Sequence, residues 1–261
     1  MRSLAILSMH TSPLAQPGTG DGGGMNVYVR ELGAALARAG VSADIYTRAA
    51  GEDQADIVNV EPGLRVHHVA AGPRAPVDKS ALPDLVDDFA AGVLDRLTDH
   101  RADALHANYW LSGVAGHKLK HSLDLPLVST FHTLDRVKAD DGDDDGPRAA
   151  AEAEVIGCSD AILASCAVEA HQLRDLYNAD PGRIEIVAPG VDHAFFAPGD
   201  RGQARRALGL AETGPLLLFV GRIQPLKGLD VAVSALADLG RAAHLVVVGG
   251  PSGPRGDDEL A

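Results

Sequence analysis

The sequence has few cysteines, few aromatic residues and no long apolar run. Its two cysteines, Cys158 and Cys166, form no Cys-x-x-Cys pair, which argues against a disulfide framework and a zinc site and favours a reducing compartment. No apolar stretch approaches the roughly 18 residues of a membrane span. The apolar run near Met1 is broken at His10, too soon for a signal peptide. We therefore predict a cytoplasmic protein with no membrane span and no metal site.

Basic charge is scarce as well. The chain has 23 Lys and Arg against 36 Asp and Glu, a formal net charge of −13. Nucleic acids and anionic membranes require a basic face, so we expect neither as a partner. A few residues can still bind a phosphate locally. The acidic run 140–145 is expected to be a solvated loop.

The sequence is rich in short apolar runs that alternate with longer amphipathic segments. Hydrophobic residues make up 46% of its 261 residues, enough for one domain and part of another. This alternation predicts βαβ units, and so an α/β fold with a parallel sheet and helices on both faces. The expected strands are 4–9, 43–47, 64–69, 104–106, 127–130, 161–164 and 184–187, and the expected helices are 25–39, 82–98, 112–121, 149–157 and 166–177.

The pattern breaks near Pro189 and restarts after a turn-rich stretch. Apolar segments 216–220 and 244–248 flank an amphipathic segment at 228–239. We predict two domains, a complete Rossmann-like N-terminal domain over 1–190 and, over 191–261, a linker with the truncated start of a second Rossmann-like domain. Two strands and a helix cannot bury a sheet by themselves, so we expect exposed apolar area there.

A glycine-rich segment, 18–26, precedes the first predicted helix. Glycines expose backbone amides, and a helix N-terminus favours anions. The alternatives are a flexible loop with a tight turn, and a nicotinamide-binding loop of the G-x-G-x-x-G type. The second alternative is disfavoured because Gly18 lies about eight residues past the strand. The next strand also ends in Thr47 and Arg48, without an acidic ribose ligand.

Three further segments follow predicted strands, where this architecture binds ligands. Segment 221–228 places Arg222 and Lys227 where they can neutralise a diphosphate leaving group; the alternative is that both are simply solvated. Segments 106–113 and 130–134 offer histidine, amide, phenol and hydroxyl groups suited to a polyol. Each histidine in them could instead be structural, as we expect for His67 and His68.

Together these segments resemble the family-4 retaining glycosyltransferases of GT-B fold, in particular the branch that acts on inositol phosphate in actinobacterial mycothiol biosynthesis. The resemblance runs from residue 1 to about 253 and is carried by 8–29, AAGP at 70–73 with Lys79, HANYWLSG at 106–113, TFHTL at 130–134, GRIQPLKG at 221–228 and GGPSGP at 249–254. It implies retaining transfer of N-acetylglucosamine from a UDP-sugar to 1D-myo-inositol 3-phosphate. The UDP-sugar is the co-substrate, no cofactor is required, and a role for Mg²⁺ and a homodimer are left open.

The resemblance also implies the roles of individual residues. His132 matches the family histidine beside the donor sugar and is the catalytic candidate. The implied donor-binding positions are Gln16, Pro17, Gly24, Arg222 and Lys227. The implied acceptor-binding positions are His10, Asp21, Gly22, Gly23, Gly24, Met25, Asn26, Lys79, Tyr109, Thr133 and Arg148, of which Lys79, Tyr109, Thr133 and Arg148 would hold the acceptor phosphate.

Some positions depart from the family pattern. Asn108 and Phe131 stand where the family has histidine and alanine. The sequences of segments 106–110 and 130–134 are also similar to those of sucrose-phosphate-synthase-like relatives. The paired glutamates that the family uses to grip the donor are absent up to Ala261. We therefore expect this chain to be an inactive fragment of an enzyme, with a sucrose-phosphate-synthase-like transferase, a non-catalytic sugar-phosphate-binding protein and a nicotinamide oxidoreductase as alternatives.

Overall fold

The computed structural model describes residues 1–261 except 18–21, 100, 139–145, 225–226, 240–242 and 252–261. The chain divides into two compact units. The first comprises Met1–Ala15 and Gly24–Pro189, and the second comprises Gln16–Gly23 and Gly190–Ala261. The short segment Gln16–Gly23 therefore groups with the C-terminal part of the chain, although it precedes the first helix.

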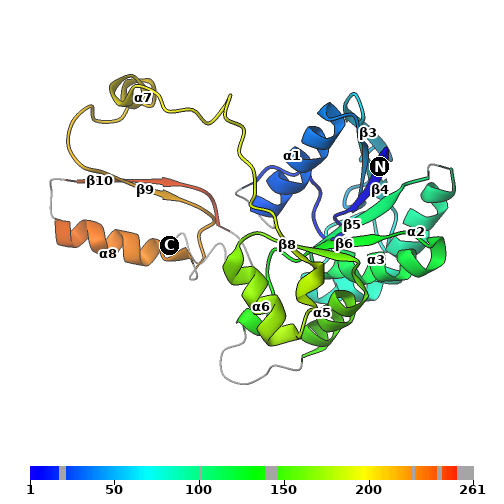
Figure 1. Ribbon diagram of the computed structural model, residues 1–261. Helices are drawn as coiled ribbons and strands as arrows, with labels where there is room; N and C mark the ends of the chain where they lie inside the picture. The colour runs from blue at the N-terminus through cyan, green and yellow to red at the C-terminus, as the bar shows by residue number, and fades with distance from the viewer. Residues whose placement is uncertain (18–21, 100, 139–145, 225–226, 240–242, 252–261) are drawn as a thin grey trace. The chain divides into compact units, whose positions relative to one another are not determined.

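The first unit is built on an eight-stranded sheet with the order β3-β4-β2-β1-β5-β6-β7-β8 (Figure 1). Its strands are β1 (Ser3–Leu7), β2 (Ser42–Arg48), β3 (Ile57–Glu61), β4 (Leu64–Val69), β5 (Ala104–Asn108), β6 (Leu127–Thr130), β7 (Ala161–Ala164) and β8 (Ile184–Ile186). All neighbouring strands pair in parallel except β3, which runs antiparallel to β4. The predicted α/β class is confirmed, and β3 is an addition to it.

Helices cover both faces of this sheet, as the sequence predicts. They are α1 (Gly24–Arg38), α2 (Val86–Asp99), α3 (Trp110–Leu123), α4 (Asp135–Lys138), α5 (Pro147–Cys158) and α6 (Ala167–Tyr177), with 3₁₀ helices η1 (Lys79–Leu85) and η2 (Pro181–Arg183). The single helix predicted over 82–98 is instead η1 followed by α2. Pro83 lies inside η1, and a proline has no N–H to donate to a continuous α-helix.

Alternate side chains of β1 enter two different parts of the core. Ala5 and Leu7 pack in a cluster with α2 and α3, whereas Leu4 and Ile6 pack in a cluster with α1. This two-residue alternation is the geometry of a strand buried on both faces. Each fully buried Leu or Ile contributes about 1.5–3 kcal/mol to folding, so the centre of the sheet is the most stable part of the unit.

The strand order reverses at β1, which lies between β2 and β5. In open α/β sheets, ligands bind outside the carboxyl ends of the strands at such a reversal. The segments that follow β1 and β5 begin at Ser8 and Tyr109. The topology therefore directs attention to these segments and to the one after β6.

The second unit contains α7 (Arg201–Ala207), β9 (Leu216–Val220), α8 (Leu229–Leu239) and β10 (His244–Val248). Strands β9 and β10 pair in parallel as a sheet of their own. The large apolar side chains of Leu218, Val220 and Val231 are more than 60% exposed. This small sheet therefore leaves apolar surface uncovered within its own unit.

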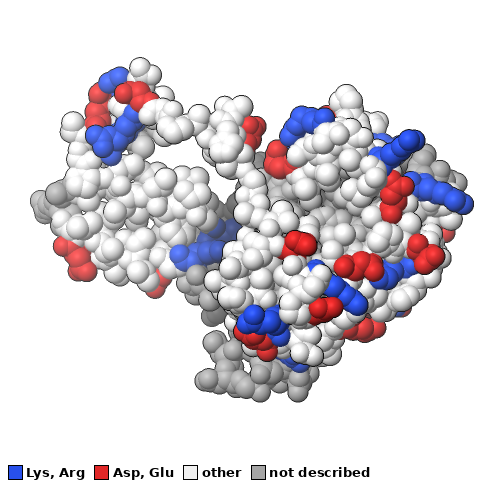
Figure 2. All heavy atoms as spheres, viewed as in Figure 1, with Lys and Arg blue, Asp and Glu red and all other residues white. Residues whose placement is uncertain are grey.

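Charge on the molecular surface is mixed. On the face shown in Figure 2, lysines and arginines are interspersed with aspartates and glutamates. Across the described part of the chain, no helix has the length and apolar composition needed to cross a membrane.

Candidate functional site

The side chain of Arg148, at the start of α5, meets the segments that follow β5 and β6. Its Nη2 donates to the Thr133 carbonyl oxygen at 3.0 Å and to Thr133 Oγ1 at 3.2 Å. The guanidinium carbon lies 5.0 Å from the centre of the Tyr109 ring, a cation–π distance. Three residues expected to hold a phosphate thus converge, although they are far apart in the sequence.

Glu152 holds Arg148 in this position. Its Oε1 accepts from Arg148 Nε at 2.8 Å, and its side chain is fully buried. The other carboxylate oxygen accepts from the Tyr177 hydroxyl and, at 2.9 Å, from the backbone N–H of Asp135. Glu152 was not among the predicted site residues. The available signal was its spacing of four residues from Arg148, which would place the two side chains on one face if the predicted helix 149–157 began slightly earlier, as α5 does.

Tyr109 has an unusual backbone conformation at the junction of β5 and α3. Its φ is 76°, a left-handed value that is rare for a bulky residue. Its N–H donates to the Thr130 carbonyl at 2.8 Å and its carbonyl accepts from Gly113 at 2.9 Å, so the surrounding structure fixes the turn. The ring packs against His10, with the two ring centres 4.3 Å apart. The strained turn thereby directs the phenol toward both His10 and Arg148, a placement typical of functional sites.

His132, the catalytic candidate, also has a left-handed backbone, with φ of 62°. Its Nε2 lies 3.0 Å from Asn108 Oδ1. A carboxamide oxygen only accepts, so Nε2 carries the proton and Nδ1 is left as an acceptor. Burial lowers the pKa of His132 from 6.5 to about 4. At neutral pH the ring is therefore an uncharged group that can accept a hydrogen bond from a hydroxyl.

Two neighbours complete the surroundings of His132. The Tyr28 ring meets it edge to face at 5.1 Å. Asn108 is completely buried, and its Nδ2 makes no hydrogen bond with any described residue. A buried donor without a partner is costly, so a ligand that reached Asn108 Nδ2 would gain a hydrogen bond.

His106, the other histidine of the two predicted segments, lies in the core. Its Nε2 is 2.9 Å from Thr130 Oγ1. Burial, together with the nearby His132, lowers its pKa to about 4. Strand β5 continues to Asn108, so His106 lies inside the strand rather than at its end. His106 therefore has the structural role that the sequence left as an alternative.

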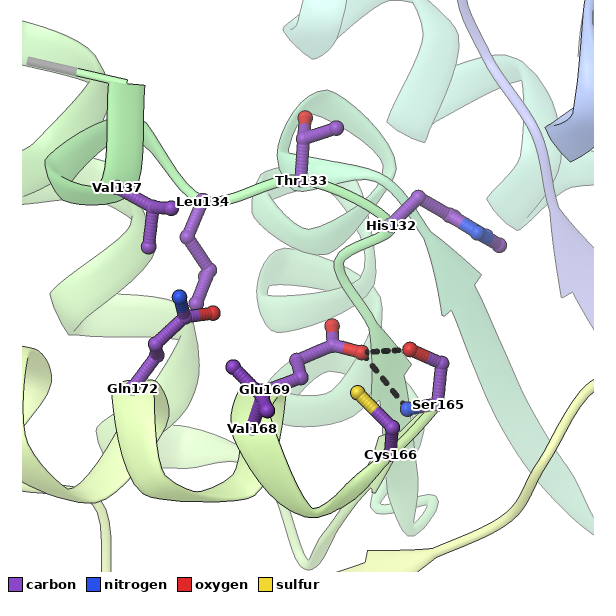
Figure 3. A pocket seen from close by; sticks show the side chains of 9 residues that line it. All are labelled: His132, Thr133, Leu134, Val137, Ser165, Cys166, Val168, Glu169 and Gln172. Carbon is purple, nitrogen blue, oxygen red and sulfur yellow. Dashed lines mark hydrogen bonds between the residues drawn. The ribbon is translucent and has the colours of Figure 1, made fainter.

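A cavity of about 270 Å³ opens beside His132. Figure 3 shows the segment of His132, Thr133 and Leu134 along one side and the beginning of α6 along the other, with Glu169 between them. Glu169 accepts from the Ser165 N–H at 2.7 Å and from the Ser165 hydroxyl at 2.5 Å. The cavity offers a carboxylate, hydroxyl groups and an imidazole, a set that suits a polyol.

Asn26, near the start of α1, uses its amide to hold the segment after β1. It is 1% exposed, and its Nδ2 donates to the Thr11 hydroxyl and, at 2.5 Å, to the Ser12 carbonyl. Met25 packs partly buried against the core. In this structure Asn26 therefore helps to place the loop, and Met25 packs on the core.

The glycines before α1 differ in their surroundings. Gly24, the first residue of α1, is exposed and has open space where a Cβ would lie. Gly22 is buried. A Cβ on Gly23 would lie 4.0 Å from Arg222 Nε. Asp21 lies outside the described residues.

The remaining predicted residues divide between the two units. Lys79 begins η1 with an exposed side chain, two residues after Val77, which packs on the same core cluster as Tyr109. The predicted donor-binding residues of the second unit comprise two on the segment before α1 and two after β9: Gln16, Pro17, Arg222 and Lys227. Arg222 is half-buried and the other three are exposed.

Two protein-family models match the chain. The model described as a glycosyl transferase 4-like domain matches residues 23–190, and the model described as glycosyl transferases group 1 matches residues 177–260. The first covers well over half of the chain. The two matches meet near the junction at Pro189.

Curated relatives are similar along the whole chain. A D-inositol 3-phosphate glycosyltransferase of Actinosynnema mirum is 47% identical over 100% of this chain and 66% of its own length. A protein of the same name from Mycolicibacterium gilvum is 48% identical over 97% of this chain and 59% of its own length. The chain thus spans about six tenths of the length of such relatives.

Solved structures share the architecture. A sucrose-phosphate synthase from Thermosynechococcus elongatus aligns over 100% of this chain and 66% of its own, with a TM-score of 0.90 and 28% identity. The Anabaena protein HepE in complex with UDP and glucose aligns over 100% of this chain and 64% of its own, with a TM-score of 0.73 and 16% identity. At that identity the second likeness concerns the fold alone. Together the two matches confirm the GT-B-like α/β architecture expected from the sequence.

Proposed function

The chain belongs to the glycosyltransferase family defined by the glycosyl transferase 4-like domain, and from this premise we propose that it acts in the transfer of N-acetylglucosamine from a UDP-sugar to 1D-myo-inositol 3-phosphate with retention. The names of the relatives at 47% and 48% identity support this acceptor. The proposed location is cytoplasmic.

One observation carries the acceptor assignment: Arg148, Thr133 and Tyr109 converge from three segments. A phosphate dianion that leaves water needs several donors to replace its hydration. The Arg148 fork supplies charge and directed N–H groups, and the hydroxyls of Thr133 and Tyr109 can add neutral hydrogen bonds. Nη1 of Arg148 makes no hydrogen bond with a described residue, so its donors are left for the phosphate.

Helix ends add to this attraction. Both α3 and α5 begin next to the cluster, at Trp110 and Pro147, and neither has a side-chain cap on its first amides. The N-terminus of a helix favours an anion through free N–H groups and the helix dipole. We propose that Lys79 supplies the second positive charge when the acceptor binds.

His132 and the cavity suit the sugar that is transferred. Because its pKa is near 4, the imidazole stays neutral and its Nδ1 can accept a hydrogen bond from a sugar hydroxyl. In this role His132 orients the donor sugar and adds no positive charge where an oxocarbenium-like centre develops.

The donor diphosphate is assigned to the second unit. The half-buried Arg222 follows β9, and Gly23 approaches its Nε. We propose that Arg222 and Lys227 neutralise the diphosphate as it leaves, with Gln16 and Pro17 on the adjoining segment. Stabilising charge as it develops on a leaving group is a large source of catalysis. The acceptor hydroxyl then attacks on the face that the diphosphate leaves.

A binding and transfer screen tests the proposal. Calorimetric titration should show binding of 1D-myo-inositol 3-phosphate but not of myo-inositol, which lacks the phosphate, and binding of UDP but not of NAD. Transfer should be assayed with UDP-N-acetylglucosamine and UDP-glucose. Equal affinity for myo-inositol and for its phosphate would contradict the proposed phosphate site. Preference for NAD would support the oxidoreductase alternative.

The likeness to sucrose-phosphate synthase favours a second candidate. It rests on 28% identity and a TM-score of 0.90, and Asn108 and Phe131 depart from the inositol-phosphate pattern. The same screen includes a fructose phosphate, which is the acceptor half of sucrose phosphate. Tighter binding of the fructose phosphate than of the inositol phosphate would select this candidate.

A further inference from the structure

Side chains of types that can bind a metal ion lie close together where α3 packs on α5. These residues have no part in the proposed transfer. One ligand atom from each of His117, His121 and Cys158 lies within 4.8 Å of the other two. The two histidines are four residues apart on α3, so they share one face of the helix. Glu154 lies four residues before Cys158 on α5 and approaches His117 Nε2 at 3.4 Å. Two helices therefore each contribute a pair of ligands.

We propose that these four residues form a structural zinc site that links α3 to α5. Zinc takes four ligands in a tetrahedron and accepts thiolate, imidazole and carboxylate groups. A set of four protein ligands leaves no open position, which is the arrangement of a structural rather than a catalytic site.

The distances fit this coordination. In a tetrahedral zinc site a sulfur and a nitrogen ligand lie about 3.5 Å apart, and a nitrogen and an oxygen ligand about 3.3 Å apart. Cys158 Sγ lies 3.6 Å from His121 Nε2, and His117 Nε2 lies 3.4 Å from Glu154 Oε1. Two of the six ligand–ligand distances of a tetrahedron are therefore present. Glu154 lies outside the group of three mutually close ligand atoms, so its side chain would have to turn toward Cys158 and His121 when zinc binds.

The charges fit as well. A thiolate and a carboxylate together neutralise a divalent cation, so the occupied site carries no net charge. Lys120 lies near the thiol, but its ammonium is bound to Asp160 at 2.7 Å. His117 would bind zinc through Nε2, the ring nitrogen that faces Glu154.

The proposal departs from the sequence-based expectation of no metal site. That expectation rested on cysteine spacing alone. Here one cysteine combines with two histidines that lie about 40 residues earlier, and only the packing of the two helices brings them together. The same helices carry Tyr109 and Arg148 at their N-terminal ends, so zinc would fix the elements that hold the phosphate site.

Cobalt and zinc titrations of the chain test the site. Co²⁺ should bind with one ion per chain and give a thiolate-to-cobalt charge-transfer band together with the visible bands of a tetrahedral ion. Cys158→Ser should abolish the charge-transfer band, and His121→Gln should weaken Co²⁺ and Zn²⁺ binding by at least about tenfold. Cys158 is half-buried and His121 is exposed, so both variants should fold, which circular dichroism verifies.

The control is Cys166→Ser, which removes the other thiol from an exposed position just before α6 and should leave both titrations unchanged. Zinc at a hundredfold excess over its Kd should also raise the Tm of the wild-type chain by roughly 5 °C and should not raise that of Cys158→Ser. The site is overturned if the cobalt spectrum lacks the charge-transfer band, or if Cys158→Ser binds Zn²⁺ as the wild type does.

Discussion

The guanidinium of Arg148 stacks 5.0 Å from the centre of the Tyr109 ring while its Nε is bound to the buried carboxylate of Glu152. The side chain is thus fixed from two directions, and its Nη1 makes no hydrogen bond with a described residue. A planar, pre-oriented fork of this kind loses less conformational entropy on binding a phosphate than a flexible chain does.

Arg148→Lys should keep the positive charge but lose the planar guanidinium with its paired N–H donors. Binding of 1D-myo-inositol 3-phosphate is expected to weaken by at least about tenfold, because an ammonium cannot replace the directed pair of N–H donors. Calorimetric titration measures this change, and UDP binding in the same chain should be unaffected. The exposed Arg174, paired with Asp175, gives the control Arg174→Lys. Equal weakening by both variants would contradict the assignment.

Lys79→Ala tests the second positive charge of the phosphate site. The affinity for the inositol phosphate should fall by about tenfold or more and should become less sensitive to salt. Affinity for UDP should be retained. A matched control is Lys118→Ala, which removes another exposed lysine, one bound to Asp87 at 2.6 Å on the outside of α3. If the loss extends to UDP, misfolding rather than a lost phosphate contact is the cause.

Stability should decrease as the pH falls from about 6.5 to about 4. The pKa values of His106 and His132 are lowered from 6.5 to about 4 in the folded chain, chiefly by burial. In this window the unfolded chain binds protons that the folded chain does not, so protonation favours unfolding. The free energy of unfolding should drop by up to about 3 kcal/mol for each histidine.

Urea unfolding at a series of pH values measures this decrease. His106→Gln removes one of the two titrations and should make the dependence on pH shallower. His171→Gln replaces an exposed histidine on α6 and should leave the dependence as it is in the wild type. A wild-type stability that does not change between pH 6.5 and 4.5 would falsify the prediction.

Asp44→Ala should be strongly destabilising. Asp44 on β2 accepts from Arg65 at 2.7 and 2.9 Å and is 2.8 Å from His67 Nε2. Burial raises the pKa of Asp44, but the hydrogen bonds from His67 and Arg65 outweigh it and hold that pKa below its ordinary value. Removing the carboxylate leaves both partners unsatisfied, and we expect a loss of about 3 kcal/mol in the free energy of unfolding.

Asp56→Ala is the comparison for Asp44→Ala. Asp56 also pairs with an arginine, Arg74, at 3.0 Å, but its side chain is 68% exposed. Exposed pairs contribute less than about 1 kcal/mol, so this variant should unfold at nearly the wild-type urea concentration. Similar losses for the two variants would show that burial does not set the cost.

Gly249→Ala should disturb the second unit alone. Gly249 has φ of 148°, and a Cβ there would lie 1.8 Å from the Gly221 carbonyl oxygen. The backbone must move to relieve this contact, so the hydrogen bonds from Gly221 to Val248 and from Ile223 to Gly250 should weaken. Amide hydrogen exchange at Gly221 and Ile223 should speed up.

Exchange in the first unit should stay as it is in the wild type, and Gly199→Ala is the control because a Cβ at Gly199 meets nothing within 4 Å. Unchanged protection at the two amides in Gly249→Ala would show that the loop has another backbone conformation.

The central strands of the sheet could be predicted from the sequence, but the edge strand β3 could not. The central strand β1 contains the continuous apolar run Leu4–Leu7, which is visible without a structure. Strand β3 was missed because it lies at the edge of the sheet, where all five of its residues are only partly buried or, like Ile57, exposed. A strand that contributes little to the core has a weak hydrophobic pattern.

The site was predicted as a set of positions, and its internal geometry was not. The family resemblance supplied Tyr109, Thr133 and Arg148 as positions for the acceptor phosphate. It could not show the left-handed backbone of Tyr109 and His132, because φ depends on what surrounds the turn. The partnership of Glu152 with Tyr177 was also out of reach, since it depends on how α5 packs against α6.

The grouping of Gln16–Gly23 with the C-terminal residues means that the chain passes between the two units three times: after Ala15, after Gly23 and after Pro189. Cutting the gene at residue 190 would therefore not yield two independent pieces. The N-terminal product would keep an eight-residue insert whose packing partners had been removed, and the C-terminal product would lack it. A sound dissection would bridge Ala15 to Gly24 with a short linker and supply the excised segment in trans.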